Sequence, residues 1–126
     1  MSETTNTQTR PEDNRIGTFK AKIVGARAGK SRGGHDEIVM TLERCDDPNT
    51  WYQVFHTLSS TVCADGPNKG TPYKDVIVAA WDIDLADVRG SLEGRYAMVN
   101  RFADKYTDDA GEIQEARKCR VLMIAA

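Results

Sequence analysis

From residue 18 to residue 24 the chain reads TFKAKIV, and this short stretch decides the fold class. Its apolar side chains fall on one face of an extended chain and its two lysines on the other. The apolar set is Phe19, Ala21 and Ile23, and the cationic set is Lys20 and Lys22. A period of two is typical of a half-buried β-strand. The segment therefore predicts a strand with one face in a hydrophobic core.

Four further segments have strand patterns, at residues 38–43, 51–58, 95–106 and 116–124. They alternate in polarity or are dense in aromatic and β-branched residues. Glycine- or aspartate-rich turns separate them at 27–35, 46–49 and 107–111. Between the third and fourth strands, residues 71–80 have helical spacing, with Thr71 placed to cap and Trp81 expected in the core. Residues 84–94 are expected to connect this helix to the next strand, either as a loop or with one short helical turn.

The predicted order is three strands, one helix and two strands, which is the arrangement of the OB-fold. The expected fold class is mainly β: a five-stranded Greek-key barrel with one helix between strands 3 and 4. A length of 126 residues fits one domain. We expect residues 1–14 to form a flexible N-terminal tail, since they have few apolar side chains, and residues 15–126 to form the single domain.

Composition narrows the functional classes. The three cysteines lie far apart without a CxxC pair, which suits a reducing compartment. No apolar run approaches the length of a membrane helix, and the N-terminus lacks a secretion signal. These features indicate a cytoplasmic protein with no membrane partner.

Charge is unevenly distributed along the chain. The net charge is −2, but residues 15–44 carry +4 and residues 45–94 carry −5. A local basic surface attracts phosphate even on a slightly acidic protein. The acidic segment 45–94 argues against nucleic-acid binding and for binding of a protein, because it repels phosphate.

Enzymatic chemistry finds little support in the sequence. The stretch GARAGKS at residues 25–31 resembles a phosphate-binding P-loop, but only three residues separate its glycines and no helix is expected after it. The two histidines and three cysteines have no zinc spacing and form no recognisable catalytic constellation. We therefore expect no enzyme activity, no metal and no cofactor.

Short motifs resemble small phage and prophage proteins that bind single-stranded DNA through an OB-fold. The resemblance is carried by GTFKAKI at 17–23, SRGG at 31–34 before IVMTL at 38–42, and LEGRYAMV at 92–99. It implies binding of single-stranded DNA in phage-type replication or recombination, in the cytoplasm of the host cell. Many such proteins end in an acidic tail that recruits partners, whereas this chain ends in RVLMIAA. Recruitment of replication or recombination proteins by that route is therefore in doubt.

The candidate interface combines cations with aromatic rings, because single-strand binders pair phosphates and stack bases. Cations are expected on the first hairpin tip and on the strands, and stacking rings on strands 3 and 4. Arg117 belongs to the basic cluster of the last strand. The candidate residues are Lys20, Lys22, Arg27, Lys30, Arg32, Trp51, Phe55, Tyr96, Arg101, Phe102, Lys105, Tyr106, Lys118 and Arg120.

Several alternatives remain open at this point. Trp51 and Phe55 face outward in one register of the third strand and fill the core in the other. The cations on the strands either contact phosphate or protect sheet edges from aggregation. The alternative function is an OB-type interaction module for a host or replisome protein, and an edge strand near the C-terminus makes a homodimer reasonable.

Overall fold

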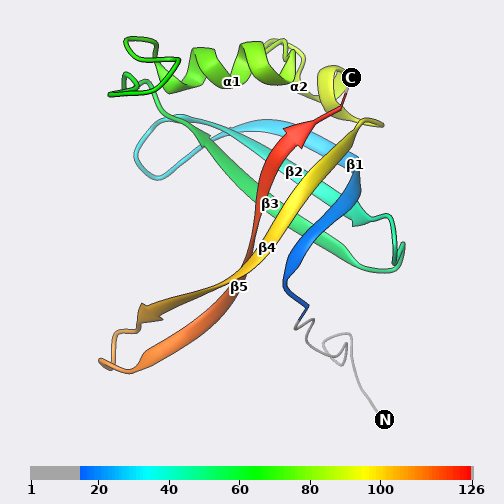
Figure 1. The fold of residues 1–126 in the computed structure, drawn as a ribbon, viewed down its shortest axis with the longest axis vertical. Helices are drawn as coiled ribbons and strands as arrows, with labels where there is room; N and C mark the ends of the chain where they lie inside the picture. The colour runs from blue at the N-terminus through cyan, green and yellow to red at the C-terminus, as the bar shows by residue number, and fades with distance from the viewer. Residues whose placement is uncertain (1–14, 126) are drawn as a thin grey trace.

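The computed structural model describes residues 15–125, so the tail expected at 1–14 lies outside the described residues. Figure 1 shows a strongly curved sheet with two helices over one end. The elements are β1 (Gly17–Lys30), β2 (Asp36–Arg44), β3 (Trp51–Leu58), α1 (Tyr73–Trp81), α2 (Val88–Leu92), β4 (Tyr96–Thr107) and β5 (Ile113–Ile124).

All five strands form one antiparallel sheet in the order β3-β2-β1-β4-β5. The prediction of a mainly β fold with five strands is confirmed. The expected closed barrel is not observed: β3 and β5 are the two edges of the sheet, and no ladder joins them within residues 15–125.

Strand β1 is longer than its sequence predicts. Residues 27–30, expected in the turn, instead pair with β2, and Arg27 lies opposite Val39. A bulge between Ile23 and Gly25 lets the strand bend and continue through its glycines. Only residues 31–35 remain as the connection, where Gly34 takes a φ of 82°.

The core lies on the concave face of the sheet, where β1 contributes the apolar set predicted from its alternation. Its largest fully buried side chains are Ile23, Ile38, Met40, Leu42, Leu58, Leu92 and Val99. The expected alternation of β5 fails near its end, because the register of β4 and β5 shifts between Met98 and Val99. Ile124 is therefore buried, and Met123 points out.

Two helices, rather than the one expected, lie between β3 and β4. Helix α1 begins one residue after Pro72, and no side chain caps it, so the capping role expected for Thr71 is wrong. Trp81 is buried, as predicted. The second helix, α2, occupies the expected connector and buries Val88 and Leu92.

Beyond the core, the β4–β5 hairpin extends away from the rest of the sheet (Figure 1). Its far end pairs Thr107 with Ile113 around a tight turn. Among residues 15–125 there is no helix of the length and hydrophobicity needed to cross a membrane.

Candidate nucleic-acid interface

The side chains of β3 alternate between the core and the outer surface. Val54 and Leu58 are buried, whereas Trp51 and Phe55 are 55% and 57% exposed. Of the two registers that the sequence left open, the structure has the one that turns the two aromatic rings outward. Because β3 is an edge strand, these rings lie beside an edge of the sheet.

The Trp51 ring is held in place despite its exposure. Its Nε1 donates to Glu43 Oε2 and to the carbonyl oxygen of Pro48, each at 3.2 Å. Glu43 lies directly opposite Trp51 on β2. A fixed, exposed ring is a prepared stacking surface, since little side-chain freedom remains to be lost on binding.

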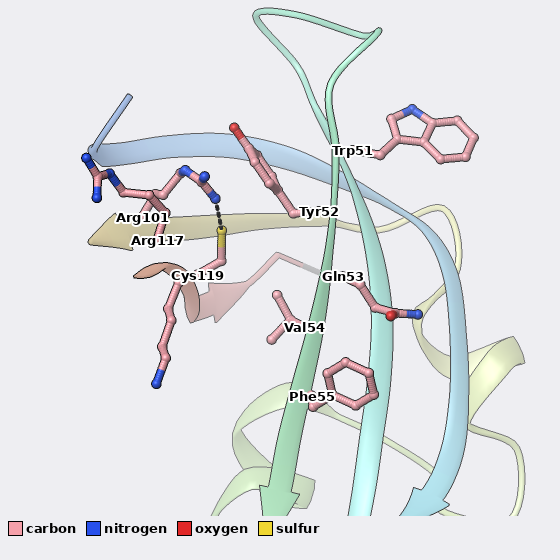
Figure 2. Close-up of a pocket in the computed structure, with 9 residues that line it drawn as sticks. Trp51, Tyr52, Gln53, Val54, Phe55, Arg101, Arg117 and Cys119 are labelled. Carbon is pink, nitrogen blue, oxygen red and sulfur yellow. Dashed lines mark hydrogen bonds between the residues drawn. The ribbon is translucent and has the colours of Figure 1, made fainter. Parts of the chain in front are cut away.

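A groove of about 540 Å³ lies along the edge of β3, between this strand and the β4–β5 hairpin. It is lined by Trp51, Tyr52, Gln53, Val54, Phe55, Arg101, Arg117, Lys118 and Cys119. In Figure 2, Tyr52 and Val54 point toward the arginines and Cys119, while Trp51, Gln53 and Phe55 project from the other side of β3. The groove therefore joins a cationic wall to a strand with exposed rings.

Arg101 contributes a nearly buried guanidinium to the cationic wall. It is 9% exposed and lies 4.6 Å from the centre of the Tyr52 ring. Its Nη1 donates a hydrogen bond to Cys119 Sγ at 3.7 Å (Figure 2). The alternation of this strand sets Arg101 and Phe102 on opposite faces, and in the structure Arg101 is buried on the concave side while Phe102 is half-buried on the other side.

Arg117 belongs to the groove, although it was not among the candidate residues. Its Nη1 donates to Glu115 Oε1 at 2.5 Å, and its buried Nε has no acceptor within residues 15–125. A buried donor without an acceptor is costly, and an oxyanion would satisfy it. The alternation of β5, which sets Arg117 on the same face as Cys119, was the signal that could have found it.

Six candidate residues lie on a second surface. The outer side of β1, β4 and β5 carries Lys20, Lys22, Tyr96, Phe102, Lys118 and Arg120. Lys20 Nζ lies 4.8 Å from the Tyr96 ring centre, and the Arg120 guanidinium lies 5.1 Å from that of Phe102. The structure therefore distributes the candidate residues over two surfaces.

The cations of the first hairpin, between β1 and β2, are less free to contact phosphate than the sequence indicates. Lys30 Nζ donates to Asp36 at 2.5 Å, and Lys74 of α1 donates to the same carboxylate. These two bonds lower the pKa of Asp36 from 3.8 to about 2. Of the remaining loop cations, Arg32 is exposed in the turn. Arg27 of β1 and Phe55 of β3 lie on either side of Val39 of β2, with which both are paired.

Two of the predicted interface residues, and both histidines, lie outside the groove. Lys105 and Tyr106 are exposed near the far end of the β4–β5 hairpin. His56 packs between β3 and α1, 4.6 Å from the Trp81 ring centre, and its Nε2 is 2.9 Å from the Tyr73 hydroxyl. Within residues 15–125, no three His, Cys, Asp or Glu side chains are grouped so as to hold a metal ion.

Comparison of the chain with protein-family models gives no match, and comparison with curated proteins gives no match either.

Proposed function

We propose that this protein binds single-stranded DNA with little sequence preference, without catalysis, through the groove beside β3. One observation carries the proposal: β3, the edge strand that carries the exposed rings of Trp51 and Phe55, also forms one wall of a groove whose other wall holds three cations from the β4–β5 hairpin. Stacking surfaces beside a cationic channel are the usual means of holding unpaired nucleotides.

The topology supports an OB-type module. Strand β1 pairs with both β2 and β4, and both helices lie between β3 and β4. That order is expected of a five-stranded Greek-key barrel with β3 and β5 as its last neighbours. The groove lies where those two strands would meet. In such folds the outer face of strands 2 and 3 takes part in binding oligonucleotides.

The proposed contacts to bases and to phosphates account for binding with little sequence preference. Bases would stack on Trp51 and Phe55, and every base has a face that stacks. Phosphates would contact Arg117, Lys118 and the inner guanidinium of Arg101, and such contacts carry no sequence information. The biological setting we propose, phage-type replication or recombination, rests on the sequence resemblance.

The alternative function, a module that binds a host or replisome protein, has one observation in its favour. Both β3 and β5 are sheet edges, and an edge can accept an extended segment of another chain. A stable complex with a protein partner that forms without nucleic acid would favour this alternative.

Tryptophan fluorescence tests the proposal, because the chain has only two tryptophans and they differ in environment. Trp51 is exposed and Trp81 is 4% exposed. Titration with a thymidine oligomer at low salt should quench the emission of the wild type. The variant Trp51→Phe should retain the Trp81 emission and lose the quench.

Two results would contradict the proposal. The first is no quench in the wild type at low salt. The second is a quench of full size in Trp51→Phe, which would move the ligand away from β3.

A further inference from the structure

The outer surface of β1, β4 and β5 is cationic and carries little opposing charge. Three cations point outward there away from the groove, Lys20, Lys22 and Arg120, and a fourth, Lys118, points outward at the border of the groove. The part of these strands that spans the core comprises residues 18–22, 96–104 and 116–123. Among the outward side chains of these residues, Asp104 is the one carboxylate. It pairs with Lys118 at 2.7 Å. We call this surface the outer β4 face.

Aromatic rings, and no carboxylates, hold two of these cations in place. Lys20 lies over Tyr96, and Arg120 lies over Phe102. A cation–π contact fixes the position of a cation without cancelling its charge. Both side chains therefore keep their full attraction for an anion. The cations cover part of each ring, and Tyr96 remains 40% exposed while Phe102 is half-buried.

The outer β4 face continues from the surface that carries Trp51. Trp51 lies opposite Glu43, Glu43 lies opposite Lys22, and Lys22 lies opposite Tyr96. This row crosses four neighbouring strands on one side of the sheet. A chain that leaves Trp51 reaches the outer β4 face without crossing the core or a helix, and it passes one carboxylate, Glu43, which accepts a hydrogen bond from Trp51 Nε1.

We propose that the outer β4 face is a second contact surface for the same single strand and that it binds the phosphate backbone. The inference rests on the proposed function and deepens it. Bases stack beside β3, and the strand then continues over β1 and β4, where Lys20, Lys22 and Arg120 neutralise its phosphates. The number of nucleotides bound is consequently larger than the groove alone accounts for.

Charge decides against a second copy of the chain as the occupant. In a two-fold interface each patch faces itself, so the cations of one copy would lie against those of the other. Like charges opposed in this way are destabilising. The occupant must be an anion, and the continuity with Trp51 favours nucleic acid over an acidic protein.

Oligomers of two lengths test the inference with the double variant Lys20→Ala/Arg120→Ala. A thymidine oligomer of about 8 nucleotides fits within one OB-type site, whereas one of about 30 exceeds it. Affinity for the short oligomer should be unchanged. For the long oligomer, the slope of log K against log salt should become shallower by about 1.4, and affinity at about 0.1 M salt should fall roughly 25-fold.

Lys69→Ala/Arg89→Ala is the matched control, because it removes two positive charges from the loop after β3 and from α2. Thermal unfolding of both variants shows whether each is folded. A loss for the long oligomer confined to the Lys20/Arg120 variant supports the inference.

Each other outcome overturns it: no loss, an equal loss for both lengths, or the same loss in the control. Oligoglutamate that binds the wild type as tightly as the long oligomer, with binding lost in the double variant, would assign the face to an acidic protein. Failure of the wild type to bind the short oligomer is a separate result, since it contradicts the proposed function itself.

Discussion

At Trp51 and Phe55 the side chains add little to the core, since more than half of each is exposed. Trp51→Ala and Phe55→Ala should therefore each weaken single-strand binding by about 1–3 kcal/mol, which is the usual loss of one stacked base. Stability should change by about 0.5 kcal/mol or less, as for other surface substitutions. Fluorescence anisotropy with a labelled oligomer measures the first effect, and urea unfolding measures the second.

Ile113→Ala provides a control, because Ile113 is also exposed but lies at the start of β5, outside the lining of the groove and outside the outer β4 face. It should leave binding unchanged. Equal losses in all three variants would mean that exposed apolar area, rather than stacking beside β3, determines affinity.

His56 should make stability depend on pH. Burial lowers its pKa below the ordinary 6.5, so the folded protein keeps the ring neutral while the unfolded chain binds a proton. The stabilisation is complete well above pH 6.5 and is lost as pH falls from about 6.5 toward the folded pKa. Urea unfolding at about pH 7.5, 6.5 and 5.5 should show a falling midpoint.

The variant His56→Gln tests the assignment, since glutamine keeps a polar partner for the Tyr73 hydroxyl but does not titrate. It should flatten the pH dependence, whereas His35→Gln, in the exposed turn, should not. A pH dependence that survives in His56→Gln would assign it to other groups.

From the sequence, the kind of side chain on each strand was easier to predict than the face of the sheet to which that side chain points. The alternation of β4 and β5 separates Arg101 from Phe102 and Arg120 from Cys119, but it does not say which of the two faces the sheet buries. Direction depends on which face the sheet buries, and the bulge beside Met98 changes it within β5. Asp36 of β2 pairs with both Lys30 of β1 and Lys74 of α1, and this junction of three elements leaves no local signal in the sequence.

A side-chain cap stabilises the start of helix α2. Asp87 Oδ1 accepts a hydrogen bond from Gly90 N at 2.9 Å, which caps the helix. A Cβ at Gly90 would lie 2.2 Å from Asp87 Oδ2. Gly90→Ala should therefore lower the free energy of unfolding, although alanine is the better helix former. Asp87→Ala alone should cost about 0.5–2 kcal/mol.

A double-mutant cycle separates this contact from general damage to the helix. In the Asp87→Ala background the obstruction is absent, so Gly90→Ala should be neutral or stabilising. Additive losses in the double variant, measured by urea unfolding, would show that Asp87 is not the obstacle.

Whole strands were the most predictable elements. Strand β3 has the bounds that its sequence indicates, because β-branched and aromatic residues fill it without interruption. Strand β1 extends beyond its predicted bounds. Gly25 and Gly29 locally indicate a turn, but in the structure both pair with β2. The capping prediction at Thr71 failed because Pro72, rather than Thr71, immediately precedes the first turn of α1.

Across the whole molecule, the sheet order predicts how the backbone opens. Strand β2 is paired with β1 and with β3 over nearly its whole length, whereas β3 and β5 are edges. Amide hydrogen exchange should therefore be slowest in residues 38–42 of β2 and faster in β3 and β5. Addition of a thymidine oligomer should slow exchange along β3, and unchanged exchange there at saturation would place the ligand elsewhere.

The groove itself lay beyond sequence prediction. Alternation indicates which side chains share a face, but the approach of β3 to the β4–β5 hairpin depends on how strongly the sheet curves. Residues 52 and 119 meet only through that curvature, with a separation of 67 positions in the chain.

The most direct test of single-strand binding is the affinity for a labelled thymidine oligomer measured over a series of salt concentrations. Three groove cations that release counterions predict a slope of log K against log salt of about −2 or steeper. A duplex of equal length should bind more weakly, because paired bases cannot stack on Trp51 and Phe55. No binding at low salt, a slope near zero, or equal affinity for the duplex would contradict the account.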